Sequence, residues 1–202
     1  MVYKEVFERV QACEMNIGYS RAVDKDKLRD SVQELTGRRV RHIRIPSLSV
    51  TDTRGIFLRA PKARISGGIA ENGNPDVILT PSGLADTYME RFIYVKELMH
   101  VFEKPDHYTA IADDFRGLIG DIDYSVVKKC EQAKSDMAAR WIALSLMCND
   151  QDRIRCLEEY RETREKDYHD IIEDFRIPGE VIGGLFEDRY DDMVFEAKQR
   201  FF

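Results

Sequence analysis

Apolar residues recur along this chain with two different periods, and the change between them divides the sequence. Over residues 2–15, apolar side chains fall three and four positions apart, which is the spacing of one helical face. A second helix is predicted from Asp24, a residue type that caps helix N-termini, to Gly37, a type that follows helix C-termini. Residues 1–37 are therefore expected to form two N-terminal helices.

Short apolar runs bounded by turn residues replace the helical period after residue 38. Three strands are predicted, near residues 39–45, 54–60 and 76–80, with Gly, Asn and Pro in the connections. No segment between these strands has the length and period of a helix. We therefore expect a small, mostly antiparallel, three-stranded sheet rather than parallel strands joined by helices.

From Ser82 onward the pattern is almost entirely helical. Helical segments are predicted near residues 84–103, 124–148, 152–175, 179–186 and 188–199. The order of helices, small sheet and helices predicts an α+β fold in which the sheet packs on helices. We expect N-terminal helices over 1–37, a core over 38–148 and a helical C-terminal extension over 149–202, together forming one compact unit.

Composition and charge narrow the classes of function. The chain has 202 residues, 43% of them hydrophobic, and its net charge of −6 argues against a general nucleic-acid binder. We expect no membrane partner, because no secretory signal is present and no apolar run approaches about 18 residues. The four cysteines form no CxxC pair, so reduced thiols in a cytoplasm are expected.

Residues 96–100 read Lys-Glu-Leu-Met-His, which differs at its first position from the zinc-binding sequence His-Glu-x-x-His. In the intact motif both histidines bind one zinc ion, and the glutamate activates the metal-bound water. Glu97 and His100 occupy matching positions, but Lys96 replaces the first histidine. A charged ammonium has no lone pair for zinc and repels a divalent cation. We therefore expect no cofactor, with Glu97 and His100 as vestiges of a site.

The surroundings of this motif resemble the ImmA/IrrE family of phage- and stress-linked metallopeptidases. In that family a small sheet leads into an Arg-Phe-x-x-x-His-Glu-x-x-His helix, and Arg91 and Phe92 stand at the matching offset. The family's later helix resembles residues 135–148, and its closing helix-turn-helix-like element resembles residues 171–182. The resemblance covers residues 38–186 and implies a zincin-like core.

The resemblance also implies an acidic third zinc ligand on the later helix. That position falls on Ser135, and Asp136 is its neighbour, so Asp136 is at most a vestigial ligand. We expect Lys96 to form an ion pair with Asp136 or Glu131 in place of the metal.

Substrates in the active family are typically helix-turn-helix repressors. We therefore interpret the chain as a catalytically inactive metallopeptidase-like protein that binds another protein. The partner would be a helix-turn-helix regulator or a toxin–antitoxin-like protein, in a phage or mobile-element context. One alternative is an active zinc metallopeptidase with a non-standard ligand set, such as His100, Asp136 and one further residue, that cleaves a repressor.

Two surfaces are candidates for partner binding. The strand near 76–80 leads into the motif helix, so its edge at Val77, Ile78 and Leu79 is predicted to pair with an extended partner segment. The first strand carries a basic cluster, formed by Arg38, Arg39, Arg41 and Arg44. The cluster is explained equally well by an anionic partner and by charge protection of an edge strand. A DNA-associated regulator, with the cluster as its contact surface, is the second alternative.

Overall fold

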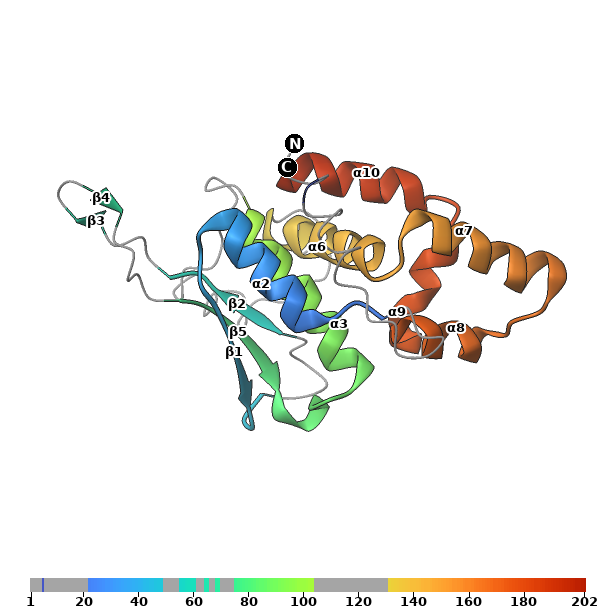
Figure 1. Ribbon diagram of the computed structural model, residues 1–202, viewed down its shortest axis with the longest axis horizontal. Coiled ribbons are helices and arrows are strands. Elements are labelled where there is room, and N and C mark those ends of the chain that lie inside the picture. The colour runs from blue at the N-terminus through green and yellow to red at the C-terminus, as the bar shows by residue number, and fades with distance from the viewer. Residues whose placement is uncertain are drawn as a thin grey trace.

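The computed structural model describes residue 5 and residues 22–48, 55–60, 64–65, 68–69, 75–103 and 131–202 (Figure 1). The helix predicted over residues 2–15 lies outside these ranges. The described elements follow the order of a helix, short strands and then helices, which confirms the α+β fold class.

Helix α2, Lys25–Thr36, has the two ends that the sequence predicts. The Asp24 side chain accepts hydrogen bonds from the amides of Asp26 and Lys27, and Gly37 closes the helix with φ of 65°. Both are local devices that satisfy backbone groups at helix ends. Leu28 and Val32, one turn apart, are fully buried and hold the helix on the core.

The sheet contains β1, Val40–Ile45, β2, Ile56–Leu58, and β5, Asp76–Pro81, in the order β1-β5-β2. Strand β2 is antiparallel to β5, whereas β1 is parallel to it, so the sheet is mixed. The prediction of mostly antiparallel pairing was wrong for β1, because the connection over residues 46–75 is long enough for the crossover that two parallel strands require. That connection includes a small antiparallel ribbon of β3, Arg64–Ile65, and β4, Gly68–Ile69.

Strand β5 is the central strand, so the prediction that a partner segment pairs with its edge is wrong. Val77 and Leu79 have partners in both β1 and β2, and Ile78 is fully buried. The backbone groups of β5 therefore pair within the sheet and offer no free edge to a partner. Among the described strands, β1 and β2 form the two edges of this sheet.

The motif helix is α3, Tyr88–Met99, and a 3-10 turn, His100–Phe102, continues it. The C-terminal half contains α6, Glu131–Met147, α7, Asp150–Glu158, α8, Tyr168–Phe175, α9, Gly179–Ile182, a 3-10 turn, Gly183–Phe186, and α10, Tyr190–Phe201.

The single helix predicted over residues 152–175 is in fact two helices. A turn of π-helix follows α7, and Arg164 then takes a left-handed conformation with φ of 56°. Helix α8 begins afresh at a capping box in which Asp167 and Asp170 each accept a hydrogen bond from the other's backbone amide. The segment between the two helices is rich in charged residues, which are Arg161, Glu162, Arg164, Glu165 and Lys166.

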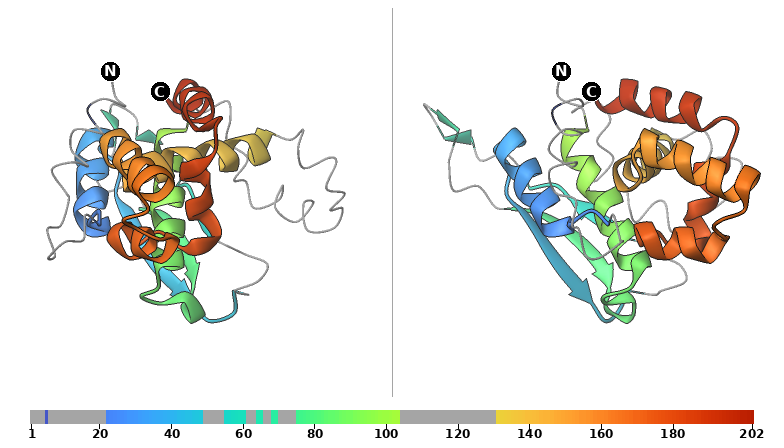
Figure 2. Two further views of the ribbon diagram at one scale, coloured as in Figure 1. Left: turned by 90° about the vertical axis from the view of Figure 1, so that its right-hand side faces the viewer. Right: turned by 45° about the vertical axis from the view of Figure 1, so that its right-hand side comes forward.

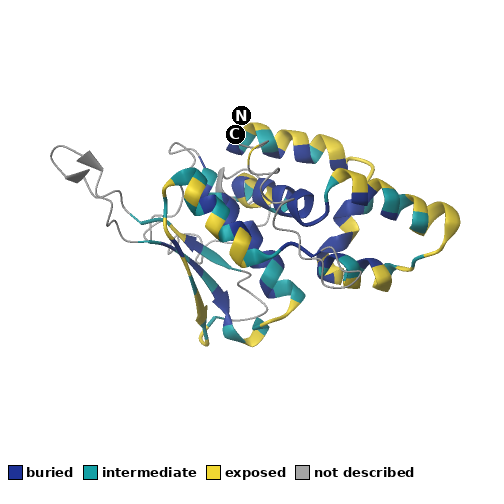
Figure 3. Cartoon of the chain, viewed as in Figure 1, coloured by how far each residue is buried: buried dark blue, intermediate teal, exposed yellow. Residues whose placement is uncertain are grey.

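The described helices lie on one side of the sheet, as Figures 1 and 2 show. Helix α3 packs between β5 and α6, and α10 packs on the far side of α6. One cluster of buried apolar side chains runs through these layers, from Val40 in β1 to Phe201 in α10 (Figure 3). Among the described helices, none combines the length and the apolar character needed to cross a membrane.

Candidate functional site

The candidate site lies where α3 crosses α6. Helix α3 starts at Thr87, whose side-chain oxygen accepts a hydrogen bond from the amide of Glu90. From Phe92 to Met99 every residue of the helix is buried, because the sheet covers one side and α6 the other. Lys96 and Glu97 are therefore charged groups inside an otherwise apolar layer.

Lys96 makes two ion pairs at this crossing. Its ammonium contacts the carboxylate of Asp136 on α6, and its Nζ lies 2.9 Å from Oε1 of the adjacent Glu97. The Lys96 and Glu97 side chains are 7% and 4% exposed, whereas that of Asp136 is 56% exposed. The ammonium thus lies on the buried side of the cluster, and Asp136 closes it toward solvent.

The charge of Lys96 is stabilised by its neighbours. Burial by itself would lower the pKa of the ammonium, but the carboxylates of Glu97 and Asp136 outweigh burial and raise this pKa above its ordinary value. Lys96 is consequently protonated at neutral pH. A protonated amine has no lone pair for a metal ion or a carbonyl carbon, so Lys96 is neither a ligand nor a nucleophile.

His100, one turn after Lys96, belongs to a second polar group. Its Nδ1 lies 3.2 Å from Oε2 of Glu103, and the hydroxyl of Ser135 on α6 donates a hydrogen bond to the other oxygen of Glu103. The imidazole ring stacks on Phe57, with 5.9 Å between ring centroids. Ser135 is 1% exposed and its proton is directed to a carboxylate, so its hydroxyl is not placed to attack a substrate.

Glu103 and Arg59 were not predicted as part of the site. Arg59 donates to the backbone carbonyls of His100, Val101 and Glu103, at 3.2, 2.6 and 3.4 Å, and so caps the end of the motif helix. Glu103 stands three residues after His100, a spacing that brings helical side chains together and is visible in the sequence. No local pattern points to Arg59, which arrives from the end of β2.

The residues at this crossing do not fit a zinc ion. A catalytic zinc site uses three protein ligands, and the charged Lys96 stands where the resemblance expects the first of them. The carboxylates of Glu97 and Asp136 are paired with that ammonium, and Ser135 stands where the resemblance expects an acidic ligand. Within the described residues no group of three or more His, Cys, Asp or Glu side chains is arranged to hold a metal. The absence of a cofactor remains a prediction.

The structure brings Lys96 and Asp136 into contact, whereas Glu131 begins α6 and its side chain lies outside what the structure describes. That this pair stands in place of a metal remains a prediction. Arg91 and Phe92, which carry part of the family resemblance, have structural contacts. Arg91 donates to the carbonyl of Val23, and Phe92 is buried.

The basic cluster of β1 divides into paired and unpaired residues. Arg38 binds both carboxylate oxygens of Asp76, at 2.6 and 2.5 Å. Arg44 binds both oxygens of Glu90, at 2.6 and 2.7 Å. Arg39 and Arg41 are exposed and form no ion pair with the residues that the structure describes. The charge available to an outside partner is therefore that of Arg39 and Arg41.

Glu90 is a second buried carboxylate on α3, and it joins three elements. Besides Arg44 of β1, it accepts hydrogen bonds from the hydroxyl of Thr80 in β5, at 3.2 Å, and from the amide of Asp86, at 2.9 Å. Glu90 is fully buried. These contacts indicate that Glu90 holds the sheet against the motif helix and has a structural rather than a catalytic role.

Comparisons of the chain with protein families, with curated proteins and with solved structures give no match.

Proposed function

We propose that this chain is a catalytically inactive, metallopeptidase-like protein that acts by binding another protein. The observation that carries the proposal is the buried ammonium of Lys96 between Glu97 and Asp136, at the position where the resemblance places a metal ligand. The ion pair connects α3 to α6 as a bridging metal would. A fold of this kind can keep a binding surface after the chemistry is lost.

The class of partner follows from the resemblance of the motif regions to the ImmA/IrrE family. The partner is a helix-turn-helix regulator or a toxin–antitoxin-like protein, encoded close to this chain. Binding without cleavage would make the chain an anti-repressor or an inhibitor.

Direct DNA regulation has less support. Arg38 and Arg44 form ion pairs with Asp76 and Glu90, so two arginines of the basic cluster remain to contact phosphate. The net charge of the chain is −6, which opposes DNA binding. The second helix of the helix-turn-helix-like element buries Val181 and Ile182 and has no Arg or Lys to present to base edges. Duplex binding that weakens steeply with salt would be the signature of this alternative.

The experiment mixes the full chain, purified without chelator, with the regulator encoded beside it. We expect a stable complex in which the intact mass of the regulator stays unchanged, and elemental analysis well below one zinc per chain. About one zinc per chain together with regulator cleavage that Glu97→Gln abolishes would establish the active metallopeptidase instead. Lys96→His alone is not expected to create activity, because Ser135 still occupies the acidic ligand position.

A further inference from the structure

The outer face of the sheet, turned away from the helices, is apolar. Side chains alternate along each strand, and Val40, Phe57 and Ile78 fill the inner face. Besides Ile45 and Pro81 at the strand ends, the opposite parity places five apolar side chains on the outer face: Ile43, Ile56, Leu58, Val77 and Leu79. We call these five residues the outer apolar face.

The strand register arranges the outer apolar face in two rows. Leu58, Val77 and Arg41 are aligned across the three strands, and Ile56, Leu79 and Ile43 form the next row. Ile43 and Leu58 are 38% and 42% exposed, and the other apolar members are half-buried. Among the described elements, the helices lie on the other side of the sheet (Figure 2). An apolar sheet face is normally covered by another layer of structure.

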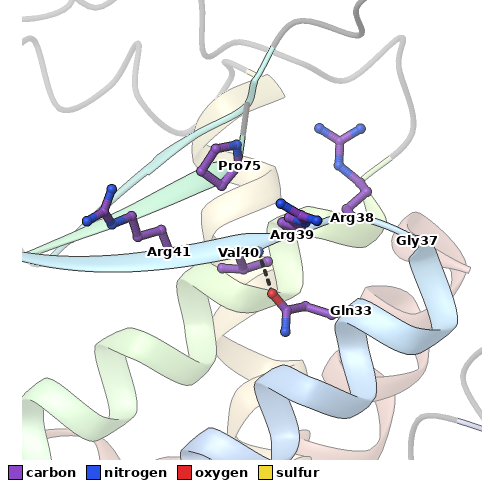
Figure 4. A pocket seen from close by; sticks show the side chains of 7 residues that line it. All are labelled: Gln33, Gly37, Arg38, Arg39, Val40, Arg41 and Pro75. Atoms are coloured by element: carbon purple, nitrogen blue, oxygen red, sulfur yellow. Dashed lines mark hydrogen bonds between the residues drawn. The ribbon is translucent and has the colours of Figure 1, made fainter. Parts of the chain in front are cut away.

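One end of this face is positively charged. Arg41 ends one row, and Arg39, the residue before β1, lies two residues earlier with the same parity. A pocket beside the start of β1 is lined by Arg38, Arg39 and Arg41 together with Gln33, Gly37, Val40 and Pro75 (Figure 4). Because Arg38 is bound to Asp76, Arg39 and Arg41 are the arginines of this pocket that have no ion pair with the described residues.

The free edge of β1 is a less suitable docking site than its face. The outward-directed amide of Val40 is already bonded to the Gln33 side chain, at 2.8 Å (Figure 4). An added strand would have to break this bond. An element that lies across the face leaves it intact.

The dimensions of the face match one helix. Three strands span about 10 Å between the outer two, and an α-helix with its side chains is about 10 Å wide. We propose that the outer apolar face docks an amphipathic helix of a partner protein, whose acidic side chains meet Arg39 and Arg41. This inference rests on the proposed protein-binding function and names the surface and the chemistry of the partner.

The test selects binders from a phage-displayed library of random peptides, each about 16 residues long, enough for a helix of roughly 24 Å. The target is the full chain. We expect enrichment of sequences with apolar residues at helical spacing and with Asp or Glu toward one end. Binding of a selected peptide should weaken about tenfold or more in Leu58→Asp and in Arg41→Glu. It should also weaken between about 0.1 M and about 1 M salt.

Two control variants carry comparable changes at exposed positions away from the outer apolar face. Phe195→Asp alters an exposed apolar residue of α10, 62% exposed, and Lys27→Glu reverses an exposed charge on α2. Both should bind the selected peptides as the unmodified chain does. The assignment is overturned if no such peptides are enriched, or if Leu58→Asp and Arg41→Glu bind as well as the controls.

Other occupants of the face give different results, and each overturns the proposal. If a second copy covers it, light scattering will show a dimer that Leu58→Asp converts to monomer. If another part of the same chain covers it, Leu58→Asp will lower the melting temperature far more than Phe195→Asp does. A duplex DNA oligonucleotide that binds through Arg41 while no peptide is enriched would replace the helix with nucleic acid.

The experiments distinguish an error in the proposed docking surface from an error in the proposed function. Zinc content and the regulator's intact mass report on function and do not involve Leu58 or Arg41. A stable regulator complex that Leu58→Asp and Arg41→Glu leave unchanged would overturn the surface alone. Zinc-dependent cleavage, with peptide binding that still requires Leu58 and Arg41, would overturn the inactive assignment alone.

Discussion

Lys96 on α3 and Asp136 on α6 form an ion pair whose two ends differ in environment. The Lys96 side chain is 7% exposed and that of Asp136 is 56% exposed. On the buried side, Lys96 also neutralises Glu97, which is 4% exposed. Removing the Lys96 ammonium should therefore lower the free energy of unfolding by a different amount than removing the Asp136 carboxylate.

Lys96→Met is expected to lower the free energy of unfolding by about 3 kcal/mol, because it leaves the buried Glu97 carboxylate without its cation. Asp136→Asn should cost less than about 1 kcal/mol, since water replaces much of what the exposed carboxylate loses. Denaturation by urea measures both variants. Equal costs would contradict the buried role assigned to Lys96.

Glu90→Gln is expected to cost about 1.5–3 kcal/mol, because it removes the charge-assisted hydrogen bonds of a fully buried group that joins β1, β5 and α3. Asp86→Asn is the matched control, since Asp86 pairs with the same Arg44 but its side chain is 82% exposed. That control should cost less than about 1 kcal/mol. Chemical denaturation compares the two variants.

Stability should also depend on pH through Glu90. Burial by itself would raise the pKa of Glu90, but Arg44 and the amide of Asp86 outweigh burial and lower the pKa below 4.5, its ordinary value. The unfolded chain therefore takes up this proton first as the pH falls. Above the ordinary pKa of 4.5, Glu90 makes its full contribution to the free energy of unfolding. This contribution is lost as the pH falls through the lower pKa that Glu90 has in the folded protein. Glu90→Gln should flatten the stability profile in that window, measured from neutral to acidic pH.

Gly55→Ala should destabilise the contact between β2 and the motif helix. A β-carbon at Gly55 would lie 2.4 Å from Cγ2 of Ile93 and 3.0 Å from Cγ and Oε1 of Glu97. Such overpacking costs about 1–3 kcal/mol. At Gly183 the nearest atom is the Tyr168 hydroxyl, at 3.5 Å, so Gly183→Ala should be neutral or stabilising. Thermal unfolding of the two variants tests the difference, and equal melting temperatures would contradict it.

Cys148 and Cys156 should react slowly with iodoacetamide in the folded protein. Both thiols are free and buried, and burial raises the pKa of Cys156 to about 11 and that of Cys148 well above its ordinary value. Little reactive thiolate is present at neutral pH. Mass spectrometry of labelled peptides should show slow modification in buffer and rapid modification in denaturant. Rapid labelling of either cysteine in the folded chain would contradict the burial described here.

Elements with local causes could be predicted from the sequence. The ends of α2 follow from Asp24 and Gly37, which act within a few residues of themselves. The break after α7 was missed, although Asp167 and Asp170 have the spacing of a capping box and could have revealed it. In both cases the determining interactions lie within one turn of the chain.

The site could be predicted in part. Helical spacing places Lys96 and His100 on one face of α3, and the motif resemblance points to Asp136 as a neighbour of Lys96. The contacts of Glu103 with Ser135 and of Arg59 with the end of α3 could not be predicted in this way. They join segments distant in the chain, and no local pattern records which distant group will satisfy a buried carboxylate or carbonyl.

The sequence by itself determined the α+β class, the position of each strand of the three-stranded sheet to within about two residues, and the presence of a lysine where His-Glu-x-x-His has its first histidine. Only the tertiary structure decided that β5 is central, that β1 runs parallel to it, and that Arg38 and Arg44 are paired while Arg39 and Arg41 are not. Strand periodicity records which side of a strand is apolar. It does not record which strand becomes the neighbour, because strand order depends on how the whole chain closes its core.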